Sequence, residues 1–262
     1  AYTDIDKSSD YFEAKLYTGN GGTTNVTGLD FAPNWVWIKS RTSARVHVLV
    51  DTVRGVTKRL QTNENDGEAT NSNSLTAFNS DGFTLGSYNQ SNEGSANFVS
   101  WNWKAGTSFS NDASSTSVGT IDSAGSVSTA TGFSIISWTG DGNDGATIAH
   151  GLGATPGLVI TKRRNTTGDW LTGGSVIDAA RGGANSLLLL NTTAAMDSNA
   201  EVYQTFSSTT FQVGVNAYVN TSGSTMISYC FTEKPGYSKI GRYVGNGNAD
   251  GTYVPSAFPF PT

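Results

Sequence analysis

The stretch "PNWVWIKSR" at 33–41 returns as "PGLVITKRR" at 156–164, and this repetition decides how the chain is organised. In both copies a proline opens a short apolar run, which a lysine and an arginine close. Val36 falls on Val159 when the two prolines are aligned. Self-similarity of this kind indicates a repeated structural unit.

Two further pairs of segments match in the same order along the chain. The distance from Phe83 to Val99 equals the distance from Phe211 to Ile227, sixteen residues in each case. Equal spacing argues against chance similarity. The matched pairs are "FNSDGFTLG" at 78–86 with "FSSTTFQVG" at 206–214, and "FVSWNWKAG" at 98–106 with "MISYCFTEKPG" at 226–236.

The matches divide the chain into units. They predict a first unit over 1–106 and a second over 132–236. The segment between them, 107–131, is rich in Ser, Thr, Gly and Ala, which predicts a linker or an extended surface crossing. Residues 237–262 begin like a third copy, so we expect a partial third repeat or a tail that donates strands to a neighbour.

Composition and periodicity indicate strands. Charged residues make up only 14% of the chain while Gly alone numbers 31, which disfavours a helical architecture. Trp35 and Trp37 lie on one face of a strand with period two, and Val36 and Ile38 on the other, so this strand should be buried on both sides. The predicted fold is all-β, with two tandem β-sandwich or jelly-roll-like units.

Several functional classes are disfavoured at once. The net charge is −5, and the chain lacks the clustered Lys and Arg residues that nucleic-acid binding needs. One cysteine, Cys230, permits neither an intrachain disulfide nor a Cys-based zinc site. An apolar run of membrane-spanning length does not occur, so we expect no membrane insertion, and no cofactor motif is recognisable.

The sequence predicts a protein that is not an enzyme. It holds no nucleophile elbow, zinc-protease motif or phosphate-binding loop. His47 and His150 fall at different points of the repeat, and each is expected to be a packed or half-exposed strand residue. The acids in "NENDGEATNSNS" at 63–74 stand in a polar run that indicates a solvated loop rather than a glycosidase carboxylate pair.

The segments "DTVRG" at 51–55 and "DAARG" at 178–182 also correspond. We interpret them as a repeated brace in which an aspartate pairs with the arginine three residues later, around a turn that glycine closes. This interpretation predicts the pairs Asp51–Arg54 and Asp178–Arg181.

The stretch "TGDGNDG" at 139–145 could be read as a metal loop, with Asp141, Asn143 and Asp144 as weak candidate ligands. An EF-hand would need a glutamate eleven residues after Asp141, where this chain has Leu152. Related turns, "TGNGG" at 18–22 and "VGNGNADG" at 244–251, vary in acid content. The favoured interpretation is therefore a glycine-rich turn, and no metal is predicted.

Three aromatic residues are candidates for receptor or glycan recognition. Tyr88 and Tyr218 fall at nearly matching loop positions, and Trp170 lies in the polar "NTTGDWLTGG". Exposed aromatic rings among amide and hydroxyl groups suit recognition. The alternative is that each ring only packs against its own hairpin and contacts no ligand.

The matched segments resemble the repeat family found in tail-fibre and other structural proteins of marine bacteriophages. The resemblance covers nearly the whole chain outside 1–10 and 107–131. The segments that carry it are "FAPNWVWIKSR", "VDTVRG", "LTAFNSDGFTLG" and "FVSWNWKAG" in the first unit, and "GFSIISWTGDGNDGATIAHGLGATPGLVITKRR" and "FQVGVNAYVNTSGSTMISYCFTEKPGYSKIGRYVGNGNADG" in the second.

This resemblance implies a β-rich, trimeric appendage on the surface of a virion. We therefore expect a non-enzymatic virion structural protein, in particular a tail-fibre or receptor-binding component that mediates host attachment. Its expected partners are other virion proteins, copies of itself in a homotrimer, and a host-surface glycan. The alternatives are a capsid decoration or head-fibre protein and a secreted carbohydrate-binding module.

Overall fold

The computed structural model describes residues 5–181 and 185–254. In the first unit, one antiparallel sheet has six strands in the order β1-β9-β3-β4-β5-β6, and a second has the order β2-β8-β7. The elements are η1 (Ser8–Asp10), β1 (Phe12–Thr18), β2 (Thr24–Val26), β3 (Trp35–Ser40), β4 (Val48–Asp51), β5 (Lys58–Gln61), β6 (Ala69–Thr70), β7 (Leu75–Asn79), β8 (Gly82–Leu85), α1 (Asn89–Asn92) and β9 (Asn97–Trp103).

In the second unit, an eight-stranded sheet has the order β10-β11-β12-β20-β14-β15-β16-β17, and a small sheet has the order β13-β19-β18. The elements are β10 (Thr107–Asn111), α2 (Ala113–Thr116), β11 (Ser123–Ser128), β12 (Phe133–Thr139), β13 (Ala146–Ala149), β14 (Leu158–Arg163), β15 (Leu171–Gly173), α3 (Ser175–Arg181), β16 (Ser186–Leu189), β17 (Asp197–Ser198), β18 (Tyr203–Phe206), β19 (Thr210–Val213), α4 (Ala217–Asn220) and β20 (Thr225–Phe231).

The two units share their strand order and register. The run β1-β9-β3-β4-β5-β6 corresponds to β12-β20-β14-β15-β16-β17, and each small sheet has the same relative order. Val36 lies opposite Asn102, and Val159 lies opposite Cys230, as the sequence alignment requires. The all-β prediction is confirmed.

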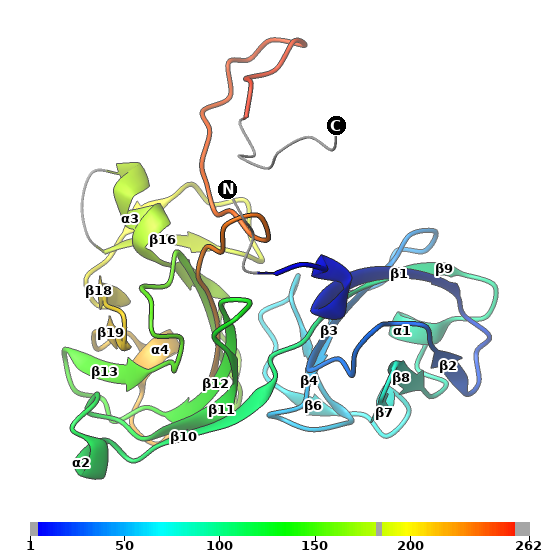
Figure 1. Cartoon of the computed structure of the whole chain (residues 1–262), viewed down its shortest axis with the longest axis horizontal. Coiled ribbons are helices and arrows are strands. Elements are labelled where there is room, and N and C mark those ends of the chain that lie inside the picture. Colours follow the sequence, from blue (N-terminus) through cyan, green and yellow to red (C-terminus); the bar gives the residue numbers. More distant parts are fainter. Residues whose placement is uncertain (1–4, 182–184, 255–262) are drawn as a thin grey trace.

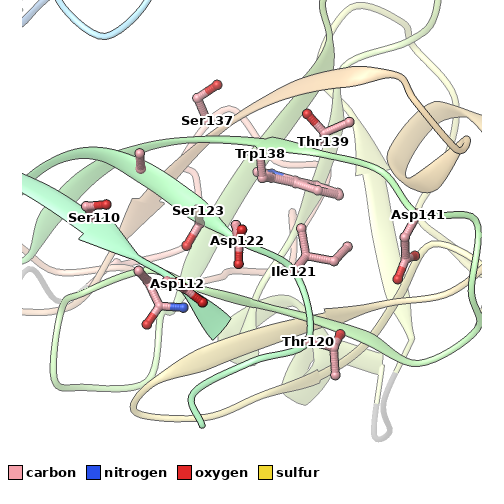
Figure 2. A pocket seen from close by; sticks show the side chains of 12 residues that line it. Ser110, Asp112, Thr120, Ile121, Asp122, Ser123, Ser137, Trp138, Thr139 and Asp141 are labelled. Carbon is pink, nitrogen blue, oxygen red and sulfur yellow. The ribbon is translucent and has the colours of Figure 1, made fainter. Parts of the chain in front are cut away.

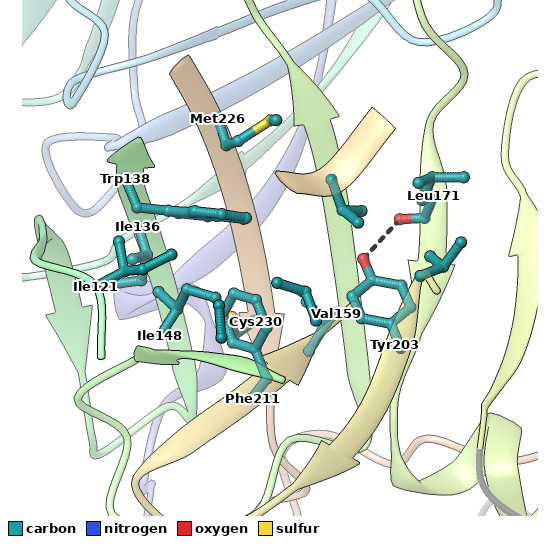
Figure 3. Close-up of a cluster of buried hydrophobic side chains, with 14 of the residues drawn as sticks. Ile121, Ile136, Trp138, Ile148, Val159, Leu171, Tyr203, Phe211, Met226 and Cys230 are labelled. Carbon is teal, nitrogen blue, oxygen red and sulfur yellow. Dashed lines mark hydrogen bonds between the residues drawn. The ribbon is translucent and has the colours of Figure 1, made fainter. Parts of the chain in front are cut away.

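Within each unit, one face of the large sheet packs on the small sheet. In the second unit this core includes Trp138, Phe211 and Cys230, and Figure 3 shows these side chains gathered between the strands. The buried Tyr203 hydroxyl donates to the Leu171 carbonyl at 3.1 Å, so its polar atom has a partner. The equivalent core of the first unit includes Val36, Ile38, Phe83 and Leu85.

The other faces of the two large sheets pack against each other. Trp35 lies at the centre of this contact, with its ring centroid 5.1 Å from that of Tyr229 and 5.6 Å from that of Phe133. The result is four layers, with a small sheet at each outer side (Figure 1). The prediction that the strand 35–40 is buried on both sides is confirmed for its first residues, since Trp35 and Val36 are both buried.

The prediction of a linker over 107–131 is wrong. Strands β10 and β11 from this segment extend the large sheet of the second unit beyond β12. A Cβ atom on Gly125 would lie 1.8 Å from the Ile135 carbonyl oxygen, so glycine is required where β11 pairs at this position. The small-residue composition reflects close strand packing rather than flexibility.

The described part of the C-terminal region, 237–254, contains no strand, although its sequence resembles the start of a unit. Tyr237 stays close to the body, with its ring 6.4 Å from that of Tyr11. Residues 241–254, which we call the C-terminal arm, are all exposed and lead away from the sheets (Figure 1). The end of the predicted third repeat, 255–262, lies outside the described residues. Among the described residues, no helix has the length and apolar character needed to cross a membrane.

Candidate functional site

A buried network of charged and polar groups connects the two units. Arg54 Nε lies 2.6 Å from Asp51 Oδ2, and neither side chain is exposed to solvent. The Tyr229 hydroxyl of the second unit donates to the same Asp51 oxygen at 2.7 Å. Burial disfavours the charged form of Arg54, yet the neighbouring Asp51 raises the pKa of its guanidinium above the usual value. The predicted Asp51–Arg54 brace is confirmed, and it also joins the units.

The network continues to the edge of the contact. Glu68 lies 3.3 Å from Arg54 and 2.9 Å from Arg164, so one carboxylate bridges an arginine from each unit. In the second unit, Asp178 Oδ1 accepts a hydrogen bond from the Ser186 backbone N–H at 2.9 Å. The side chain of Arg181, its predicted partner, lies outside the described residues. Because Asp51 and Arg54 are inaccessible, this network supports the fold and offers no surface to a substrate.

The turn "TGDGNDG" is braced by an asparagine of α4. Asn220, which is fully buried, accepts from the Asp141 N–H at 3.0 Å and donates to the Asn143 carbonyl at 2.8 Å. In the first unit, the buried Asn92 likewise accepts from the Asn20 N–H at 3.0 Å. The repeated pattern supports a turn built around a helix-borne amide.

The three weak metal candidates have protein partners instead. Asp141 Oδ1 accepts from the Asn143 N–H at 2.9 Å, and Asp144 Oδ1 accepts from Gln204 Nε2 at 2.7 Å. Burial opposes ionisation of Asp141, but the hydrogen bonds from Asn143 and Asn220 lower its pKa below the usual value. Nowhere in the described ranges do three or more His, Cys, Asp or Glu side chains gather in a metal-binding group.

Asp141 also lies at one end of a groove of about 630 Å³ over β10, β11 and β12. Figure 2 shows Asp112 and Asp122 along the same groove, with Trp138 set into its wall. Asp112 accepts from the Ser115 N–H at 3.0 Å and Asp122 from the Ala113 N–H at 2.9 Å. Trp138 is only 3% exposed, so the groove offers carboxylates engaged in turns but no aromatic face.

The three predicted recognition residues are not brought together. The Arg59 guanidinium lies 5.0 Å from the Tyr88 ring centroid, and that of Arg163 lies 5.3 Å from the Tyr218 ring. Tyr218 is 39% exposed, while Tyr88 is half-buried. Trp170 is fully buried between the units, so the prediction that it offers an exposed ring is wrong.

A second hollow, which we call the inter-unit cleft, lies close to Trp170. It has a volume of about 630 Å³, and both units line it. The first unit contributes residues of β3 and of the chain flanking β4 and β5, and the second contributes the chain that follows β16. The lining residues are Trp37, His47, Thr62, Asn63, Leu190, Asn191, Thr192 and Thr193.

Equivalent corners of the two units form the walls of this cleft. The His47 backbone N–H donates to Asn63 Oδ1 at 2.7 Å, and the Trp170 backbone N–H donates to Asn191 Oδ1 at 2.9 Å. The Trp170 indole also donates to the Gln61 carbonyl at 2.9 Å, across the unit boundary. Trp170 therefore positions both walls of the cleft without lining it.

The cleft combines an aromatic side chain with hydrogen-bonding groups. Trp37 is half-buried, and its indole N–H donates to Thr62 Oγ1 at 2.9 Å. The His47 imidazole has no hydrogen-bond partner among the described residues. Burial, and then the positive charge of Lys39, lower the pKa of His47 below its usual value, so its ring is uncharged at neutral pH. An uncharged imidazole offers one donor and one acceptor.

Sequence reasoning missed this cleft. Strand periodicity placed Trp37 on the face opposite Val36, and the polarity of "TNENDGE" after β5 was visible. The walls, however, come from segments more than a hundred residues apart, such as Asn63 and Asn191. Only the packing of one large sheet on the other brings them together.

The chain belongs to the family described as Domain of unknown function (DUF7483), whose model matches residues 7–260. No curated protein and no solved structure matches the chain.

Proposed function

We propose that this member of the DUF7483 family is a non-enzymatic structural component of a phage particle that attaches to a host-surface glycan through the inter-unit cleft. The observation that supports this function is the meeting of Trp37, the unpaired His47 imidazole and the Asn63 side chain in one solvent-accessible hollow. The phage context rests on the sequence resemblance alone.

The chemistry of the cleft suits a sugar. A pyranose presents C–H groups that pack on an aromatic side chain and hydroxyls that both donate and accept hydrogen bonds. The His47 imidazole and the hydroxyls of the exposed Thr192 and Thr193 can each donate a hydrogen bond to a sugar hydroxyl and accept one from it. None of the lining residues is charged at neutral pH, so we propose a neutral glycan.

The surroundings favour binding over catalysis. A glycoside hydrolase needs two carboxyl groups flanking the scissile bond, and the lining of the cleft includes none. The walls are held by the Trp170 hydrogen bonds and by the buried Asp51–Arg54–Tyr229 network. A rigid, preorganised hollow between two locked units limits the entropy lost on binding.

Binding of the labelled chain to a glycan array tests this function. We expect binding to neutral glycans, and we expect Thr193→Arg, which fills the cleft from an exposed position, to abolish it. The matched control is Thr209→Arg, an exposed threonine of the second unit far from the cleft lining. Equal binding by both variants would remove the cleft from the proposal.

Electron microscopy with labelled antibodies tests the particle context separately. We expect label on the tail of the source phage; label on the head would instead favour a capsid decoration. The same cleft would serve a secreted carbohydrate-binding module, which is the second candidate. Glycan binding without any label on particles would support that candidate and contradict the virion assignment.

A further inference from the structure

Strand β1 is the edge of the six-stranded sheet, and the described residues pair it on one side only. Phe12 to Thr18 pair with β9, and β1 stands first in the strand order. The equivalent strand of the second unit, β12, is paired on both sides, with β20 and with β11. The repeated unit therefore accepts a further strand at this edge, and the described part of the chain supplies none to the first unit.

The surface beside this edge is apolar. Leu16 is 64% exposed, and on the same face of the sheet it lies opposite the half-buried Val99. The ring of the neighbouring Trp101 lies 5.7 Å from that of Trp37. Trp37 in turn packs against the hydrophobic cluster between the units, so the apolar surface extends from the edge to that contact. An unpaired edge next to exposed apolar side chains is a site for adding a strand.

The C-terminal arm has the properties of a donor. Tyr243 and Tyr253 are 68% and 81% exposed, and the valines that follow them are exposed too. The sequence that enters the arm, "GYSKIGRYVGNG" at 236–247, matches "GFSIISWTGDG" at 132–142, which forms β12. The first residues of the arm, 241–244, thus correspond to the second half of β12, and no sheet of the described structure uses them.

We propose that the β1 edge receives the C-terminal arm of a second copy of this chain. Tyr237, four residues before the arm, packs beside Tyr11, the residue before β1, and the arm then leads away from its own sheets (Figure 1). A donor rooted beside an acceptor suits reciprocal exchange between copies, because each copy offers both parts at the same place. Exchange of this kind is strand addition to a sheet edge.

The hydrogen-bond register identifies the positions that face the donor. The Lys104 N–H donates to the Tyr11 carbonyl and the Gly19 N–H to the Ala96 carbonyl. By the alternation of antiparallel pairing, the odd-numbered residues of β1 bond to β9, and the N–H groups of Ala14 and Leu16 point outward. Leu16→Pro therefore removes a donor that only an added strand would use.

Light scattering after size-exclusion chromatography tests the proposal with the full chain. We expect wild type to have a multiple of the mass of one chain, and Leu16→Pro to have the mass of one. The matched control is Leu16→Thr, which keeps the backbone N–H and should still associate. The double variant Tyr243→Asp/Val244→Asp, which disables the arm, should also have the mass of one chain.

Mixing the two disabled chains separates lost pairing from lost folding. The Leu16→Pro chain keeps a working arm and the arm variant keeps a working edge, so we expect the mixture to form a complex of one chain of each kind. A monomeric wild type, or an unchanged mass for either disabled variant, would overturn the proposal. Two monomeric variants that fail to combine would also contradict it.

Discussion

Tyr229 donates its hydroxyl hydrogen to Asp51 at 2.7 Å, and this bond crosses from the second unit to the first where neither residue is exposed. Asp51 also holds the fully buried Arg54. The two repeats are therefore joined through the buried Asp51 carboxylate. Leaving a buried charge without a partner is strongly destabilising, which favours keeping the two units in contact.

Loss of the Asp51 carboxylate should therefore destabilise the whole chain. Asp51→Ala leaves the buried Arg54 with Glu68 as its one counter-ion among the described residues, and we expect a loss of about 3–5 kcal/mol in the free energy of unfolding. Tyr229→Phe leaves the ion pair intact and should cost about 1–3 kcal/mol. Urea unfolding followed by tryptophan fluorescence measures both. A smaller loss for Asp51→Ala than for Tyr229→Phe would contradict this interpretation of the network.

Trp170 should contribute to stability rather than contact a ligand. It is fully buried and bonded to both Gln61 and Asn191, so Trp170→Ala should cost about 3–5 kcal/mol in thermal or urea unfolding. The control is Tyr218→Ala, which removes a ring that is 39% exposed and should change stability far less. Similar losses for the two variants would show that Trp170 is less buried in solution than the structure indicates.

His150 should make the fold sensitive to acid. Burial lowers the pKa of His150 from 6.5 to about 4, and its ring lies between the Ser207 carbonyl and the Leu152 N–H. As pH falls, His150 therefore binds a proton in the unfolded chain before it does so in the folded chain. The stability of the fold that depends on a neutral His150 is present above pH 6.5 and is lost towards pH 4. At about 1.4 kcal/mol per pH unit, the loss approaches 3 kcal/mol.

The variant His150→Gln isolates this contribution. It removes the titrating ring while keeping a side chain that can donate and accept, so its stability should fall less than that of wild type between pH 6.5 and 4. Unfolding free energies at several pH values within this range give the comparison. Parallel pH profiles for the two proteins would show that His150 is not the titrating group.

Local sequence patterns predicted the strands well because each is governed by neighbouring residues. The alternation at Trp35 and Val36 is observed, and the aligned residues Val36 and Val159 occupy equivalent positions in their sheets. The linker prediction for 107–131 is wrong because a flexible linker and a closely packed strand can both be rich in small residues. Gly125 identifies a strand only through its close approach to the Ile135 carbonyl, which composition does not show.

The candidate site was harder to predict for the same reason. Trp170 stands among polar residues in the sequence, which predicts an exposed ring. The ring is buried because the large sheet of the first unit covers it and supplies the Gln61 carbonyl that accepts from its indole N–H. The inter-unit cleft likewise exists only because the large sheets stack. Periodicity within one segment carries no information about the angle at which two sheets meet.

The most direct test of the proposed function is calorimetric titration of an array-selected neutral glycan into wild type, Trp37→Ala and the control Tyr88→Ala. Loss of the Trp37 ring removes about 1–3 kcal/mol of packing against the sugar, so we expect affinity to fall at least about fivefold. The control, a half-buried ring outside the cleft, should keep wild-type affinity. Equal affinity for wild type and a folded Trp37→Ala would contradict glycan recognition at the inter-unit cleft.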